Sequence, residues 1–339
     1  MKNQPLICAI ICAALFTIFI PENAQCLYYT SRAKSAVPIP LSERDLTTKW
    51  ATHLKNVNKD DHTLEGALFD AKGNFYFCDV SASKVLKYTP NGALTVIAEF
   101  DNFYPSGLAF HPDGRLFVAG NSDGITRGAI YAMQPDGSDK TVILEPVAGF
   151  IPNDLVINSH GVIYFTDFKG NMTDPAGGVY YITPGSSTPE LLVGNIANAN
   201  GIALSPDEKI LWIGDYGRSI LFRIVLAETD KFNRIHSTPV YYFNGRGPDS
   251  MSIDMDGNLY VSIMSQGRTL VFNPVGIPIG QILLPGRDRG HNLYGASVAI
   301  NPQKKEMILV ARDDKGKGAN LFRARAYAKG VMPPGKDRE

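Results

Sequence analysis

The sequence lacks an excess of charge of either sign. Its 33 Lys and Arg residues match its 33 Asp and Glu residues, so the formal net charge is zero, and no long run of like charges occurs. A nucleic-acid partner normally needs a basic surface that neutralises phosphates, so the composition argues against such a partner. Charged residues make up 19% of the 339 residues and hydrophobic residues 44%, which is typical of a globular protein with a well-buried core.

Cysteine and histidine are scarce as well. The four cysteines are Cys8, Cys12, Cys26 and Cys78, and the first three lie in or at the edge of an apolar N-terminal segment. The mature chain would keep at most two of them, which excludes a disulfide framework and a thiolate metal site. Cys78 lies in a strand-like pattern and is interpreted as a buried apolar side chain. The six histidines show no metal-ligand spacing.

Residues 1–26 differ from the rest of the chain. A positive residue precedes an apolar stretch from Leu6 to Ile20, and a proline ends that stretch before a small and polar segment. This layout is typical of a secretory signal peptide. An uncleaved membrane anchor is the alternative, but the stretch is short for a span, which needs about 20 apolar residues. We therefore expect export to the periplasm or the medium, a mature N-terminus between Gln25 and Tyr29, and no stable membrane span in the mature chain.

One pattern recurs six times after this segment. Each copy opens on a small or polar residue, continues as an alternating apolar strand, turns at Asp, Asn or Gly, and runs on as a strand rich in aromatic and branched residues. Such turn residues supply the positive φ that tight strand connections need. The copies begin 41, 47, 47, 49 and 47 residues apart, at Glu65, Ser106, Asn153, Asn200, Asp249 and Ala296.

Further strand-like runs, such as 178–183 and 269–273, follow the paired strands. Four strands in a period of about 40 to 50 residues predict a propeller blade, and six copies predict an all-β, six-bladed β-propeller. We expect residues 27–339 to form this single domain, with part of the stretch 35–50 pairing with the last blade to close the ring. A tandem of β-sandwiches is the alternative fold, but it would not explain six like units.

The residue that opens each copy is expected at the mouth of the central channel, because the first strand of each propeller blade lines that channel. Four of these residues carry oxygen donors: Glu65, Asn153, Asn200 and Asp249. Each alone could merely cap a turn. Together, at equivalent positions, they predict a site in the central channel for Ca²⁺, which binds six to eight oxygens in a flexible geometry. No His or Cys joins them, so zinc is disfavoured, while other divalent cations stay open.

This quartet resembles the metal site of the senescence marker protein/gluconolactonase/luciferin-regenerating enzyme family, in which a Glu, two Asn and an Asp hold one metal in a six-bladed propeller. The resemblance runs from about Ser35 to the end of the chain and looks closest to the drug-responsive lactonase branch. The stretches that carry it are 35–39, 177–181, 199–205, 247–250, 267–273 and 277–288.

The resemblance implies a calcium-dependent hydrolase that opens a small-molecule lactone or related ester at the channel. It also implies that Ser250 is a metal ligand. A second, structural calcium of that branch would fall near Thr126, Gly128 and Glu145. The position of Asn153 is commonly Asp in that branch, so the carboxamide here removes one negative charge and would weaken metal affinity without changing the type of donor atom.

The chemistry favours Asp249 as the acid/base group. Ca²⁺ can polarise a lactone carbonyl, and a carboxylate beside a metal can also relay a proton. The metal should lower the pKa of that carboxylate, which favours a base that activates water. His291, in a loop expected near the channel, is a second candidate for proton transfer. Two other functions stay open: a non-catalytic binding propeller, and an arylesterase or phosphotriesterase that uses the same metal site.

Overall fold

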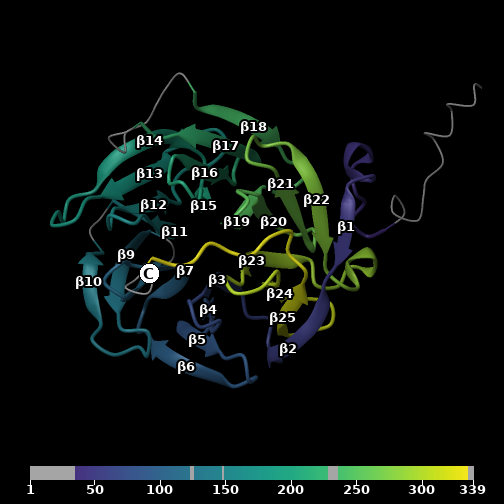
Figure 1. Ribbon diagram of the computed structural model, residues 1–339, viewed down its shortest axis with the longest axis horizontal. Helices are drawn as coiled ribbons and strands as arrows, with labels where there is room; N and C mark the ends of the chain where they lie inside the picture. The colour runs from purple at the N-terminus through teal and green to yellow at the C-terminus, as the bar shows by residue number, and fades with distance from the viewer. Residues whose placement is uncertain (1–34, 123–125, 147–148, 228–235, 335–339) are drawn as a thin grey trace, which may run out of the picture.

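The computed structural model describes residues 35–122, 126–146, 149–227 and 236–334. Six β-sheets surround a central axis, so the chain is an all-β six-bladed propeller, as the repeats predict (Figure 1). Residues 1–26, which carry the predicted signal peptide, lie outside the described residues. Within the described ranges, no helix has the length and apolar character needed to cross a membrane.

Consecutive strands of each blade run from the channel outward and pair antiparallel with their neighbours. The innermost strands are β3 (Leu64–Phe69), β7 (Tyr104–Phe110), β11 (Pro152–Ile157), β15 (Ala199–Leu204), β19 (Pro248–Ile253) and β23 (Tyr294–Ile300). The second strands are β4 (Phe75–Asp79), β8 (Leu116–Ser122), β12 (Ile163–Asp167), β16 (Ile210–Asp215), β20 (Leu259–Ile263) and β24 (Met307–Arg312). The third strands are β5 (Lys84–Tyr88), β9 (Arg127–Met133), β13 (Gly177–Ile182), β17 (Ile220–Val225), β21 (Arg268–Phe272) and β25 (Ala319–Ala324). The outer strands are β6 (Leu94–Glu99), β10 (Thr141–Leu144), β14 (Glu190–Ile196), β18 (Thr238–Tyr242), β22 (Pro278–Leu283) and β2 (Thr52–Asn58).

The turns between the first and second strands use the predicted Asp, Asn and Gly residues. In the fifth blade, Asp254 Oδ1 accepts hydrogen bonds from the backbone N–H groups of Asp256 and Asn258, and Gly257 has a φ of 78°. A side chain that satisfies its own turn and a glycine with positive φ together fix a tight connection. All six inner strands therefore run in the same direction along the channel, and they all begin at the same end of the ring.

The ring closes through β2, which forms the outer strand of the sixth blade and pairs antiparallel with β25. The prediction that part of residues 35–50 pairs with the last blade is wrong. Within that stretch, β1 (Thr47–Trp50) pairs in parallel with β22 as a fifth strand of the fifth blade. Its place is fixed by the short 3₁₀-helix η2 (Leu41–Glu43), because buried Glu43 forms an ion pair with buried Arg268 of the fifth blade.

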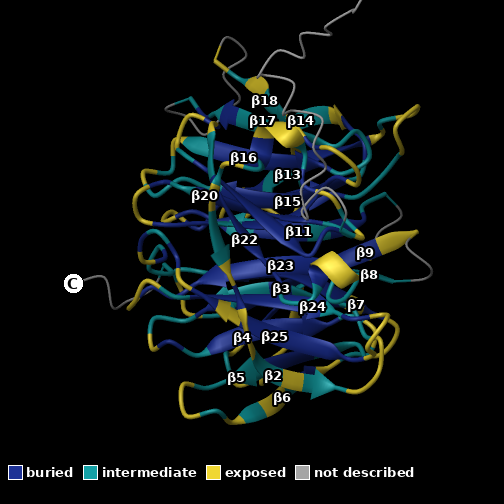
Figure 2. Cartoon of the chain, turned by 90° about the vertical axis from the view of Figure 1, so that its right-hand side faces the viewer, coloured by how far each residue is buried: buried dark blue, intermediate teal, exposed yellow. Residues whose placement is uncertain are grey.

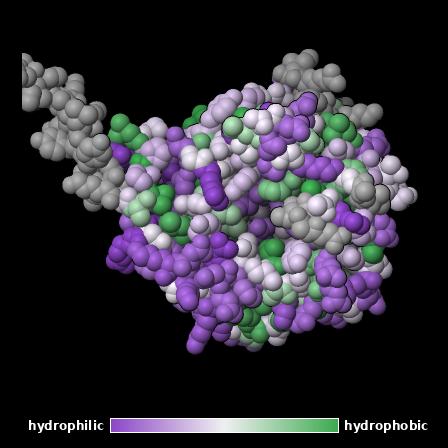
Figure 3. Space-filling model, turned by 180° about the vertical axis from the view of Figure 1, so that it is seen from behind, coloured by the Kyte–Doolittle hydropathy of each residue, from purple (hydrophilic) through white to green (hydrophobic). Residues whose placement is uncertain are grey.

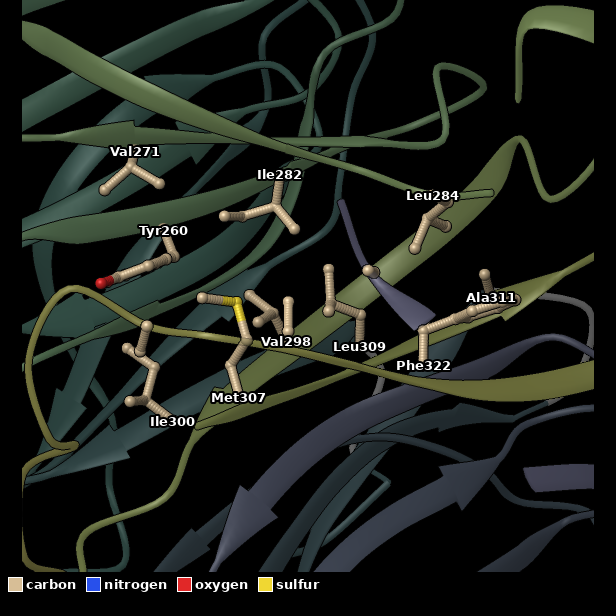
Figure 4. Packing of buried hydrophobic residues seen from close by; sticks show 13 residues of the cluster. Tyr260, Val271, Ile282, Leu284, Val298, Ile300, Met307, Leu309, Ala311 and Phe322 are labelled. Carbon is tan, nitrogen blue, oxygen red and sulfur yellow. The ribbon is translucent and has the colours of Figure 1, made fainter. Parts of the chain in front are cut away.

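Hydrophobic cores lie between neighbouring blades, and the strands are buried while exposed residues gather at turns and outer strands (Figure 2). In one core, Tyr260 and Ile282 of the fifth blade pack against Met307, Leu309 and Phe322 of the sixth (Figure 4). Cys78 is free and fully buried in the core between the first two blades, as predicted. Each blade therefore depends on its neighbours for burial of its faces.

The C-terminal segment crosses the end of the channel at which the inner strands finish (Figure 1). The N–H of Gly330 donates to the carbonyl of Asn301, and the N–H of Met255 donates to that of Lys329. Beneath the segment, a channel cavity of about 190 Å³ is lined by all six inner strands and by residues 331–334. We call this end the far mouth and the opposite end the site mouth.

Candidate functional site

The four predicted metal ligands occupy the same place in four blades. Glu65, Asn153, Asn200 and Asp249 are each the second residue of an innermost strand. The structure therefore brings all four to the site mouth. Figure 3 shows the molecule from behind, on the side opposite that seen in Figure 1. Of the two other opening residues, Ala296 offers no side-chain donor, and the Ser106 hydroxyl donates to the backbone carbonyl of Asn153 over 2.7 Å.

The inner strands are bulged at these positions. The pairing register shifts between Glu65 and Leu68 in the first blade, and corresponding shifts occur at the openings of the other five inner strands. A bulge bends its strand and re-aims a side chain, which lets the second residue face the mouth. Gly201 permits the neighbouring strand to come close, because a Cβ there would lie 2.3 Å from the carbonyl oxygen of Asp249.

The mouth concentrates negative charge. Loss of solvation raises the pKa of Glu65 well above its usual value, and the nearby charges of Asp249 and Asp154 raise it further. Burial also raises the pKa of Asp249 to about 7, although a hydrogen bond from the Asn200 side chain opposes that rise. These carboxyl groups are buried without compensating positive charge, so their ionised forms are disfavoured. A cation at the mouth would supply that charge.

Two amide oxygens also lack donors. Asn153 Oδ1 and Asn200 Oδ1 are buried and make no hydrogen bond. Because nearly all buried polar atoms in folded proteins have a partner, two orphaned acceptors beside carboxylates indicate a missing positive group. In the part of the chain that the structure describes, no group of three or more His, Cys, Asp or Glu side chains could hold a metal by itself. Any metal here must use amide oxygens, and the all-oxygen donor set fits calcium.

Asp154 belongs to the site but was not predicted. It is buried, it lines the channel cavity below the mouth, and burial raises its pKa to about 7. Ser250, the ligand implied by the family resemblance, is also buried, lines the same cavity, and lies close enough to Asp154 to oppose that rise. The repeat alignment held the signal for Asp154, because the equivalent residue is Gly in three blades and Ser in the other two.

The predicted second metal site maps to one corner of the second blade. Gly128 is the second residue of β9, Thr126 directly precedes that strand, and Glu145 directly follows β10. The two strands pair antiparallel, with Leu144 opposite Ile130, so their ends lie side by side. Residues 123–125 and 147–148, which flank this corner, lie outside the described residues, and a metal here stays a prediction.

Other polar residues at the site mouth have structural partners. Asp215, at the end of β16, accepts hydrogen bonds from the backbone of Ala197 and Arg218 and pairs with the Arg218 side chain. His291 Nδ1 lies 3.0 Å from Asp313 Oδ2, and its side chain is about one-third exposed. His291 is thus held by a loop of the sixth blade, and its predicted role in proton transfer stays a prediction.

One stretch matches the Gly-x-Ser-x-Gly pattern of serine hydrolases, from Gly120 to Gly124. Ser122 is the last residue of β8, and Arg127 begins β9. The first three residues of the pattern thus belong to β8, and the next described element is a strand, whereas a nucleophile elbow joins a strand to a helix. Its position does not support a serine nucleophile.

Known proteins resemble this chain in sequence and in fold. The lactonase drp35 of Staphylococcus aureus (strain USA300) is 39% identical over 316 residues, which cover 91% of this chain and 97% of that protein. A gluconolactonase from Xanthomonas campestris has a similar structure, with a TM-score of 0.64 and 20% identity over 80% of this chain and 88% of that chain. Regucalcin from Agrobacterium tumefaciens, a calcium-binding protein, has a TM-score of 0.66 and 16% identity over 84% of this chain and 99% of that chain.

The two structural likenesses, at this low identity, show the shared propeller fold. The sequence profile of the SMP-30/gluconolactonase/LRE-like region matches residues 21–293, which include the four opening residues and Ser250. With the lactonase relative covering nine-tenths of the sequence, the chain belongs to the SMP-30/gluconolactonase/LRE-like family.

Proposed function

We propose that this protein is a metal-dependent lactonase that hydrolyses a lactone or related ester at the site mouth. A divalent cation, preferably Ca²⁺, would be held by Glu65, Asn153, Asn200, Asp249 and Ser250. The observation that carries the proposal is the pair of orphaned amide oxygens beside carboxylates with raised pKa values. The 39% identity to a lactonase over most of the chain supports the reaction.

The bound cation would supply Lewis acidity toward the substrate carbonyl. Asp249 would accept the proton of the attacking water and later return it to the leaving alkoxide. Its pKa of about 7 applies to the metal-free site. An adjacent cation favours the ionised form, so Asp249 would be ready to act as a base at neutral pH. The backbone N–H of Ser250 donates to Asp249 Oδ1 over 3.1 Å, which helps to orient the Asp249 carboxylate.

A substrate panel tests this function. We would assay purified protein against lactones, aryl esters and a phosphotriester, with calcium and after removal of metal by a chelator. We expect lactone hydrolysis that chelation abolishes and calcium restores. Hydrolysis of the aryl esters or the phosphotriester alone would favour an arylesterase or phosphotriesterase on the same site. Bound calcium without any hydrolysis would favour a binding propeller.

The protein is also proposed to be exported, on the basis of the apolar stretch from Leu6 to Ile20. N-terminal sequencing of the protein from fractionated cells would check this. We expect a mature chain that begins between Gln25 and Tyr29 and that is found outside the cytoplasm. Recovery of a cytosolic chain that still begins at Met1 would contradict export.

A further inference from the structure

Two aromatic residues stand beside the metal site on neighbouring blades. Phe168 directly follows β12 and Tyr216 directly follows β16, so both lie in equivalent loops at the site mouth. Their ring centroids are 6.0 Å apart at an angle of 49°. Tyr216 is near enough to the ligands for the charges of Asp249 and Glu65 to help raise the pKa of its phenol, after burial as the main cause. A substrate at the mouth would therefore lie against this aromatic pair.

Arg246 lies in the loop between β18 and β19, and its positive charge is near enough to the Tyr216 phenol to lower the pKa of that phenol. Two hydrogen bonds and one close backbone contact hold the loop between β18 and β19 in place. Ser219 Oγ donates to the carbonyl of Gly245 over 3.0 Å, and Gln266 Nε2 donates to that of Asn244 over 2.5 Å. Gly247 packs so tightly on Tyr216 that a Cβ would lie 2.3 Å from the Tyr216 carbonyl oxygen. The backbone that carries Arg246 is thus held in place beside the site.

The positive charge of Arg246 has no acidic partner among the described residues. Three other arginines of this mouth form ion pairs with acids: Arg218 with Asp215, Arg287 with Asp288 and Arg312 with Asp314. Arg246 is exposed, and among the described residues no acid forms an ion pair with it. An arginine with free donors presents a planar fork that matches a carboxylate.

We propose that Arg246, in a loop that packs on Tyr216, forms a subsite for a negatively charged substituent of the substrate, so that the preferred lactones are those that carry a carboxylate. This inference rests on the proposed lactonase function. Arg246 would bind the carboxylate, while the faces of Phe168 and Tyr216 would contact the carbon skeleton. The subsite would set substrate choice and orientation, and the acid/base chemistry would stay with Asp249.

The test uses two lactones that differ only in a free carboxylate or its methyl ester. A hydrogen bond between charged groups contributes roughly 1.5–3 kcal/mol, which corresponds to about 10- to 100-fold in a rate or binding constant. We therefore expect Arg246→Gln to lower the ratio of kcat/KM for the acid over the ester by about 10- to 100-fold, chiefly through KM. Arg246→Lys keeps the positive charge but lacks the planar fork of donors. Its acid-to-ester ratio of kcat/KM should therefore lie between those of wild type and Arg246→Gln. Arg289→Gln, which removes an exposed arginine from the same end of the ring, should leave the ratio unchanged.

A second measurement separates this inference from the proposed function. A lactam carboxylate, which the enzyme would not hydrolyse, can be titrated calorimetrically onto the calcium-loaded protein. We expect binding that weakens about 10- to 100-fold in Arg246→Gln. If wild-type protein hydrolyses no lactone yet binds the lactam in this way, the lactonase function fails and the anion subsite stands. If Arg246→Gln leaves the acid-to-ester ratio and lactam binding at wild-type values, the subsite is refuted whatever the protein hydrolyses.

Discussion

At the scale of single residues, Glu65 is the proposed ligand whose charge can be removed with least change in shape. Glu65→Gln should weaken calcium binding by about tenfold or more, because the cation loses one full charge in a partly buried site. A tenfold weaker site lowers the stabilisation by excess calcium by about 1.4 kcal/mol. Thermal unfolding with and without calcium measures this, and exposed Glu190→Gln on β14 is the matched control. A calcium-induced shift in Tm as large as that of wild type would show that Glu65 is not a ligand.

Asp249 should carry the proton transfer as well as bind metal. Asp249→Asn keeps the size and one oxygen of the side chain, so metal can remain while the base is lost. General acid–base catalysis typically contributes ~10²–10⁴-fold, and kcat at saturating calcium should fall by about that factor. Exposed Asp256→Asn, at the far end of the ring, serves as the control. Near-normal turnover of Asp249→Asn with calcium bound would mean that Asp249 only binds the metal. Another group, such as His291, would then have to transfer the proton.

The sequence predicted which opening residues meet at the site mouth better than it predicted what surrounds them. Asn200 and Asp249 could be found because each opens the same strand of its repeat, so alignment of the repeats also aligns their positions in space. Arg246 and Tyr216 could not be found in this way. They lie in loops beyond the paired strands from which the repeats were aligned, and the approach of the Arg246 loop to Tyr216 depends on how two neighbouring blades pack. Asp154 is the third residue of its strand, so an alignment of the opening residues does not single it out.

At the scale of the strand, the bulged start of β15 holds Asn200 beside Asp249. Gly201→Ala would place a Cβ 2.3 Å from the Asp249 carbonyl oxygen and 2.9 Å from Ser250 Cα, so the strands must move apart. We expect a loss of about 1–3 kcal/mol in unfolding free energy and weaker calcium binding. Gly194→Ala on outer strand β14 is the matched control, because its Cβ would meet only Leu191 side-chain atoms, at 3.6 and 3.8 Å. Urea unfolding and calcium titration of both variants would check this, and equal effects would contradict it.

Strand pairing at the N-terminus shows where sequence reasoning fell short. Six like repeats fixed the number of blades, but the prediction assigned closure to residues 35–50, whereas β2 at Thr52–Asn58 closes the ring. β2 has a polar sequence with partly exposed side chains, so no strong alternation marks it as a strand. β1 is placed by the buried Glu43–Arg268 ion pair between distant parts of the chain. Such a contact has no signature in local sequence.

At the scale of the whole molecule, the acids of the site should make stability depend on pH. Asp154 and Asp249 have pKa values raised to about 7 in the metal-free fold, against about 4 in an unfolded chain. Between about pH 4 and about pH 7 the folded state then binds more protons than the unfolded state. The unfolding free energy of the metal-free protein should therefore fall as the pH rises from about 4 through about 7. The loss should be on the order of a few kcal/mol.

Calcium should change the sign of this dependence. A bound cation keeps the carboxylates ionised, and protons compete with it as the pH falls, so the calcium-loaded protein should gain stability between about pH 5 and pH 7. Urea unfolding at several pH values, with excess calcium and with a chelator, isolates the site from other titrating groups, which contribute equally to both series. Parallel curves in the two series would contradict a metal at these acids.

Because the ring closes by pairing of β2 with β25, it cannot close until the ribosome has made β25. Asn56 on β2 and Asn320 on β25 form a hydrogen bond although they are 264 positions apart. At about 5–20 residues per second, the ribosome makes the partner strand on the order of ten seconds to a minute after β2 has emerged. During that interval the sixth blade cannot form, so the propeller of the nascent chain is still an open ring. For the export proposed above, that delay would give the export machinery time to engage the chain before the ring closes.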